Sequence, residues 1–144
     1  DRIREQKVFS ANLVTEKILP LADYFGTAEG CQPEKMNVAV AWEKGAALDV
    51  PVLSDSPFAF ELEAVEFMPR GGGEVLLCKV HNVLLDEALN DPSISVEEKM
   101  RLVAPVSTTH ETYFGWDGRA LGAWHEPAKQ VKKDGGARET PYTV

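Results

Sequence analysis

The sequence predicts an α+β domain built mainly on antiparallel strands, with helices between and after them. Two observations carry this prediction. In residues 58–65 two sets of residues alternate with the period of a strand that buries one face, and the set predicted to be buried is Phe58, Phe60, Leu62 and Ala64. Residues 69–73 read Pro-Arg-Gly-Gly-Gly, which predicts a hairpin turn into a returning strand over residues 74–85.

The elements before this hairpin follow from local signals. Residues 7–14 are β-branched and aromatic enough for a strand. The spacing of apolar residues from Thr15 to Phe25 predicts a helix, with Pro20 in its first turn or at a kink, and Gly26 is expected to end it. A second helix is predicted from Gln32-Pro33 to about Trp42, and residues 45–57 form an irregular connection with one short strand.

The returning strand and the C-terminal part complete the pattern. Residues 74–85 are apolar on both faces, which predicts a strand covered on two sides. Ser95 and Glu98 form a capping box that begins a helix to about Val103. The glycine-bearing aromatic segments 113–116 and 121–124 follow, and we expect one domain over residues 1–128 and a polar arm or tail over residues 129–144.

Composition limits the functions that this chain of 144 residues can have. A hydrophobic share of 44% with 26% charged residues is typical of one soluble globular domain, and no apolar run approaches the ~20 residues of a membrane span. The net charge of −8 argues against nucleic acid as a partner. The N-terminus has neither Met nor a signal core, so we expect a cytoplasmic protein and a missing upstream segment.

The cysteines and histidines do not form a recognisable metal or redox motif. Cys31 and Cys78 form no CxxC pair and are expected to be reduced, buried small side chains. His81, His110 and His125 have no metal-ligand spacing, so no metal site and no catalytic residue is predicted.

Several segments share the order of one family's motifs. The strand at 7–14 has an Asn-bearing end and leads through a helix into residues 22–26, and residues 25–36 read Phe-Gly-Thr-Ala-Glu-Gly-Cys-Gln-Pro-Glu-Lys-Met. A proline-bearing loop and strand at 49–63, the strand and exit at 75–89 and the segment 111–115 follow. Residues 7–128 thus resemble the flavin-reductase-like, FMN-binding split-barrel family, especially its flavoredoxin-type branch.

The resemblance implies a Greek-key split β-barrel with flanking helices that forms a homodimer and holds FMN at the dimer interface. It implies hydride or electron transfer between NAD(P)H, FMN and an acceptor, which can be a protein, with the chain mainly positioning the two cofactors. The alternative is a truncated or non-catalytic split-barrel module that acts in dimerisation, ligand binding or protein interaction.

Flavin-binding candidates fall on the matched motifs. Gly26, Thr27 and Gly30 could present backbone amides to a phosphate, and their alternative is a helix end followed by a turn. Lys35 could pair with the phosphate or be a solvated lysine. Tyr113 and Trp116 could lie against the isoalloxazine or cover the nicotinamide site, or pack in the core or dimer interface. Asn12 is a further candidate.

Three positions depart from the family pattern. Glu29 stands where the pattern has Ser, and Cys31 stands where it often has Arg. A carboxylate in place of a hydroxyl would repel the phosphate of FMN. Cys78 replaces a common Gly on the strand at 75–85, which would change close packing there.

Overall fold

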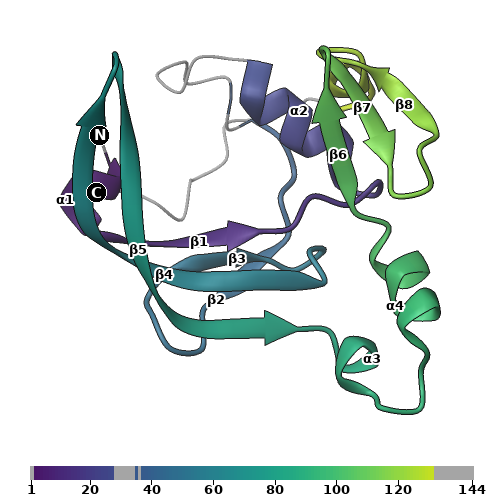
Figure 1. Ribbon diagram of the computed structural model, residues 1–144, viewed down its shortest axis with the longest axis horizontal. Helices are drawn as coiled ribbons and strands as arrows, with labels where there is room; N and C mark the ends of the chain where they lie inside the picture. The colour runs from purple at the N-terminus through teal and green to yellow at the C-terminus, as the bar shows by residue number, and fades with distance from the viewer. Residues whose placement is uncertain (1, 28–34, 36, 132–144) are drawn as a thin grey trace. The chain divides into compact units, whose positions relative to one another are not determined.

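The computed structural model describes residues 2–27, 35 and 37–131 (Figure 1). The chain divides into two compact units, each described by itself below. Unit 1 consists of Asp1–Leu13 and Ala41–Lys99, and unit 2 consists of Val14–Val40 and Met100–Val144. The helix α4, Val96–Val103, continues from the first unit into the second.

Unit 1 is built on a three-stranded antiparallel sheet in the order β1-β4-β5. Its elements are α1 (Arg2–Gln6), β1 (Val8–Asn12), β2 (Trp42–Lys44), β3 (Pro51–Leu53), β4 (Phe58–Arg70), β5 (Gly73–Leu85) and α3 (Glu87–Asn90). The strands β2 and β3 form a separate antiparallel pair. The predicted strand at 7–14 and the single short strand in the 45–57 connection are therefore both confirmed.

The hairpin of β4 and β5 is the longest element of unit 1 (Figure 1). Its turn is where the glycine run predicted it, and Gly71 and Gly72 have φ values of +48° and +91°, which glycine adopts without steric cost. The register shifts at two places, next to Val65 on β4 and next to His81 on β5. Such bulges bend a strand and increase its twist.

The predicted burial of β4 was confirmed for Ala64 but wrong for the first part of the strand. There Ala59 and Glu61 are buried, whereas Phe58 and Phe60 of the predicted buried face are only half-buried. The reason is that the Ala59 face carries the β2–β3 pair. Ser10 of the neighbouring β1 donates a side-chain hydrogen bond to the carbonyl of Pro51 at the start of β3.

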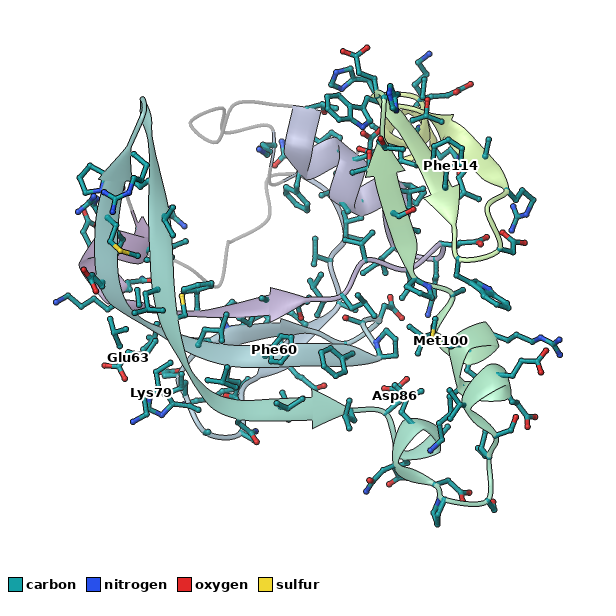
Figure 2. All side chains as sticks on the ribbon, viewed as in Figure 1. Phe60, Glu63, Lys79, Asp86, Met100 and Phe114 are labelled. Carbon is teal, nitrogen blue, oxygen red and sulfur yellow. The ribbon has the colours of Figure 1, made fainter. Side chains whose placement is uncertain are left out.

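The prediction that β5 is covered on both sides was also wrong. No described residue of β5 is buried, and large apolar side chains are exposed, with Val75 and Val80 each 51% accessible. The reason is that, among the strands the structure describes, β5 pairs with β4 alone and so forms an edge of the sheet. Figure 2 shows Glu63 and its cross-strand partner Lys79 on the hairpin, both pointing away from the sheet.

The second predicted helix does not reach Trp42. Lys35 is in a 3-10 turn, but the helix does not continue through the described residues that follow. Residues 37–41 are not helical, and Trp42 begins β2 by pairing with Leu53. Gln32, Pro33 and the rest of 28–34 lie outside the described residues, as does residue 36. The sequence Asn-Val-Ala-Val-Ala-Trp has the β-branched and aromatic residues of an extended segment, and strand pairing prevails over the proline signal.

Unit 2 combines one helix with a small sheet. The helix α2, Leu19–Thr27, begins later than predicted, with Pro20 in its first turn, and it continues through Gly26. Thr15 instead forms an isolated bridge with Pro105. The strands β6 (Val106–Thr109), β7 (Thr112–Gly115) and β8 (Ala120–Ala123) form an antiparallel meander, and the 3-10 helix η2 (Pro127–Gln130) follows.

The predicted aromatic segments 113–116 and 121–124 overlap β7 and β8, and Trp116 and Trp124 each follow the last residue of the strand. Most of the predicted C-terminal arm, residues 132–144, lies outside the described residues. In the described part of the chain, no helix is both long and apolar enough to cross a bilayer.

Candidate functional site

Asn12 lies at the end of β1 and holds two strands together. Its Oδ1 accepts a hydrogen bond of 3.0 Å from the backbone N–H of Leu53, and its Nδ2 donates one of 2.9 Å to the hydroxyl of Ser10. Both ends of the amide therefore contribute to packing β3 against β1. This accounts for Asn12 without a ligand.

The end of α2 holds the candidates that were expected near a phosphate. The hydroxyl of Thr27 donates to the carbonyl of Tyr24 at 2.9 Å, which caps one of the helix's last carbonyls. A side-chain carbon at Gly26 would meet nothing within 4 Å, so its backbone is open to approach. Lys35 has its ammonium 5.9 Å from the ring centroid of Phe25, while Gly30 lies outside the described residues.

Tyr113 on β7 is bound to a buried carboxylate. Its hydroxyl donates a 2.7 Å hydrogen bond to Oδ1 of Asp23 on α2. Asp23 is only 3% exposed, and it also accepts from the backbone N–H groups of His125 at 3.1 Å and Ala128 at 2.9 Å. One carboxylate thus joins α2, β7 and the segment that enters η2.

The pKa values of this pair follow from burial and hydrogen bonding. Desolvation raises the pKa of Asp23, but the hydrogen bonds from Tyr113, Ala128 and His125 outweigh it and bring the pKa below the ordinary 3.8. Desolvation and then the Asp23 carboxylate raise the pKa of Tyr113 to about 12. Tyr113 is therefore a neutral donor and Asp23 an ionised acceptor at neutral pH.

Trp116 lies in the turn between β7 and β8 and is 42% exposed. It lines a pocket of about 520 Å³ on the β6–β8 sheet. The pocket is formed by Pro105, Val106, Ser107, Thr109, Phe114, Gly115, Trp116 and Gly118. Figure 2 shows Phe114 beside β7.

The candidates that the structure describes are divided between the two units. Asn12 belongs to unit 1, and the other described candidates belong to unit 2. Within unit 2, Tyr113 and Phe114 are adjacent on a strand, so their side chains leave opposite faces of the sheet. Tyr113 faces Asp23, whereas Trp116 shares the other side with Phe114.

Sequence reasoning missed the two carboxylates that make the most contacts. Asp23 was included in a family motif without a role of its own, and Glu61 was placed on the opposite face of β4 from the predicted core. The available signal for Glu61 is that the residues on its own face of the strand, Ala59 and Glu63, are small or polar, whereas the other face begins with two phenylalanines. Nothing local in the sequence indicates a partner for Asp23, because Tyr113 is 90 residues away.

Glu61 is fully buried and organises the loop between β2 and β3. Its carboxylate accepts from the backbone N–H groups of Ala47 at 3.0 Å and Leu48 at 2.8 Å, and from Nδ2 of Asn82 on β5 at 2.6 Å. Desolvation raises the pKa of Glu61, but these hydrogen bonds outweigh it and lower the pKa below 4.5. Gly45 leaves room for the carboxylate, because a side-chain carbon there would contact Oε1 of Glu61 and lie 2.7 Å from the carbonyl of Leu48.

Comparison with known proteins identifies the family. Residues 1–104 match the model described as "Flavin reductase like domain". The chain belongs to the flavin reductase like family. A search of curated proteins found no match.

Solved structures of similar fold agree with this assignment. Flavoredoxin from Methanosarcina acetivorans is 17% identical, with a TM-score of 0.64 and coverage of 86% of this chain and 65% of that one. The 2-nitrobenzoate 2-nitroreductase of Pseudomonas fluorescens is 20% identical, with a TM-score of 0.61 and coverage of 81% and 59%. An FMN-binding protein from Thermus thermophilus is 24% identical, with a TM-score of 0.53 and coverage of 61% and 49%.

These likenesses confirm the predicted fold class, a mainly β split barrel with flanking helices. The chain spans less than two thirds of the length of each of these three structures. Among the described candidates, the fit to FMN is partial. The polar groups of Asn12, Thr27 and Tyr113 already bind protein atoms, and Gly26 lies inside α2, where backbone N–H groups bond within the helix. Lys35 places a cation near the ring of Phe25.

Proposed function

We propose that this protein is an FMN-binding flavin reductase or flavoredoxin-like oxidoreductase that transfers hydride or electrons between NAD(P)H, FMN and an acceptor. The observation that carries the proposal is the family match over residues 1–104. Two solved structures of similar fold support it: one is named a flavoredoxin and the other an FMN-binding protein. Bound FMN would supply reversible two-electron uptake.

The chain's own residues would bind and orient the cofactors. The ammonium of Lys35 is suited to the phosphate, because a cation can donate charge-assisted hydrogen bonds to an anion. Gly26 lies inside α2, where its N–H bonds within the helix, so it would contribute only by allowing close approach. Trp116 presents an exposed ring, which suits a flat heterocycle. Asn12, Thr27 and Tyr113 would act on the cofactor only through the strands and the helix that they hold.

Anaerobic reduction of FMN by NADH or NADPH tests this function. We expect the chain to accelerate bleaching of the flavin absorbance by at least about tenfold over free FMN with the same nucleotide, since positioning the two rings replaces a bimolecular encounter. Lys35→Gln should raise the FMN concentration needed for half the rate. A rate equal to that of free FMN with both nucleotides contradicts the proposal.

The second candidate is a non-catalytic split-barrel module that acts by dimerisation, ligand binding or protein interaction. The exposed apolar side chains of the edge strand β5 favour it, because long apolar edges invite strand pairing. We also propose that the chain forms a homodimer, as the family resemblance implies, and the same exposed edge supports it. Sedimentation equilibrium at micromolar concentration tests association, and a single monomeric species contradicts both the homodimer and a module that acts by dimerisation.

A further inference from the structure

The two faces of the β6–β8 sheet have different surroundings. On one face, Tyr113 binds Asp23 and the hydroxyl of Thr108 accepts a 2.8 Å hydrogen bond from the indole Nε1 of Trp124. Ser107 is paired with Phe114 across β6 and β7, and strand alternation places both on the opposite face. That opposite face bears the pocket of about 520 Å³.

The lining of this pocket is aromatic and uncharged. Phe114 is half-buried and Trp116 is exposed, so one ring is fixed in the sheet while the other is accessible from solvent. Ser107 and Thr109 add hydroxyl groups, each of which can donate and accept a hydrogen bond. Among the described residues that line the pocket, none has an ionisable side chain.

The turn that carries Trp116 is held in place by several interactions. The N–H of Gly115 donates to the carbonyl of Arg119 at 2.9 Å, and the guanidinium of Arg119 donates to both carboxylate oxygens of Glu16 at 3.0 and 2.9 Å. A side-chain carbon at Gly115 would come within 2.7 Å of Oε1 of Glu16, so glycine allows this close approach. The wall formed by Trp116 is therefore shaped before any ligand arrives.

We propose that this pocket binds a small, uncharged, planar aromatic molecule that carries a hydrogen-bonding group. The pocket is an open depression in the surface, large enough for one small ring system, and the rings of Phe114 and Trp116 offer flat apolar surfaces for stacking. The polar groups of the ligand would reach the hydroxyls of Ser107 and Thr109. This binding does not require bound flavin and goes beyond the proposed function.

The charges beside the pocket select against anions. Glu16 and Asp117 approach the backbone at Gly115, and Arg119 contributes one cation to these two carboxylates. The whole chain has a net charge of −8, which adds repulsion for negative ligands. An aromatic amide should therefore bind better than the carboxylate of the same shape.

NMR titration of the full chain labelled with ¹⁵N tests this proposal with benzamide as the probe. The chain has three tryptophans, so three indole N–H signals report on the sites separately, and single Trp→Phe variants assign them. We expect the Trp116 signal to shift with saturation at a Kd of about 1 mM, as for a fragment of this size. The signals of Trp42 and Trp124 should stay in place.

Variants and analogues separate specific binding from other outcomes. Trp116→Ala should weaken binding at least about tenfold, whereas the matched Trp42→Ala change should leave it unaltered. Should Trp116→Ala disturb the fold, Ser107→Asp provides a second variant, which should weaken benzamide binding by placing charge in the pocket. Equal shifts at all three indoles, no shift at Trp116, or equal affinity for benzoate or for non-planar cyclohexanecarboxamide would each overturn the proposal.

Discussion

Replacing Glu61 by glutamine is expected to lower the free energy of unfolding by about 2–4 kcal/mol. The carboxylate accepts hydrogen bonds from Ala47, Leu48 and Asn82, and an amide of the same size offers an NH₂ group where one acceptor is needed. Oε1 accepts from both loop N–H groups and Oε2 accepts from Asn82, so the NH₂ group of glutamine would face a donor on one side or the other. Urea unfolding followed by circular dichroism measures the change.

Glu63→Gln is the matched control for this experiment. Glu63 lies two positions further along β4, is partly exposed, and contacts His81 at 2.7 Å. Exposed ion pairs contribute little to stability, so the urea midpoint of this variant should be close to that of the wild type. A Glu61→Gln protein as stable as the Glu63→Gln protein would refute the assigned role of Glu61.

The pH dependence of the Glu61 effect has a defined sign. Hydrogen bonding lowers the folded-state pKa of Glu61 below 4.5, so its stabilising contribution is present above that pH. The contribution is lost as the pH falls through the folded-state pKa, because the unfolded chain takes up the proton first. Glutamine does not titrate, and the stability difference between wild type and Glu61→Gln should therefore shrink in acid.

Asp23→Ala is expected to destabilise unit 2 by about 3 kcal/mol, and Tyr113→Phe by about 1–2 kcal/mol. The alanine leaves the N–H groups of His125 and Ala128 and the tyrosine hydroxyl without their shared acceptor. The phenylalanine removes one of these three hydrogen bonds. Unfolding free energies of both single variants and the double variant give the coupling, which should be about 1 kcal/mol.

A control variant and a binding measurement accompany the prediction for Asp23 and Tyr113. Glu111→Gln, which removes the charge of an exposed carboxylate in unit 2, should leave stability nearly unaltered. FMN affinity of the folded Tyr113→Phe protein should equal that of the wild type, since the hydroxyl of Tyr113 is bound to Asp23. Additive single changes would contradict the pairing, and a loss of FMN affinity without a loss of stability would give Tyr113 a role at the flavin.

The sequence predicted those elements whose signals are local. The hairpin turn was predicted correctly because Gly71 and Gly72 meet a backbone requirement that can be read in five residues. The helix predicted from Gln32 to Trp42 failed at its end because the pairing of β2 with β3 is a tertiary contact, which prevails over weak helix signals.

The burial pattern and the site were less predictable because they depend on distant partners. The alternation over residues 58–61 of β4 is real, yet the face with Ala59 and Glu61 is the buried one, and backbone donors from the 45–48 loop satisfy the carboxylate. Trp116 could be selected from the sequence as an aromatic candidate. The pocket beside it could not be predicted, because it depends on the pairing of Ser107 with Phe114 across β6 and β7.

Titration of the purified chain with FMN, alongside riboflavin, tests the central claim most directly. Flavin fluorescence gives both dissociation constants, and their ratio isolates the contribution of the phosphate. We expect micromolar or tighter FMN binding, with riboflavin weaker by about tenfold or more, because a charge-assisted contact to the phosphate is worth about 1.5–3 kcal/mol. Absence of binding by both flavins would contradict the assignment as an FMN-dependent oxidoreductase and favour the non-catalytic module.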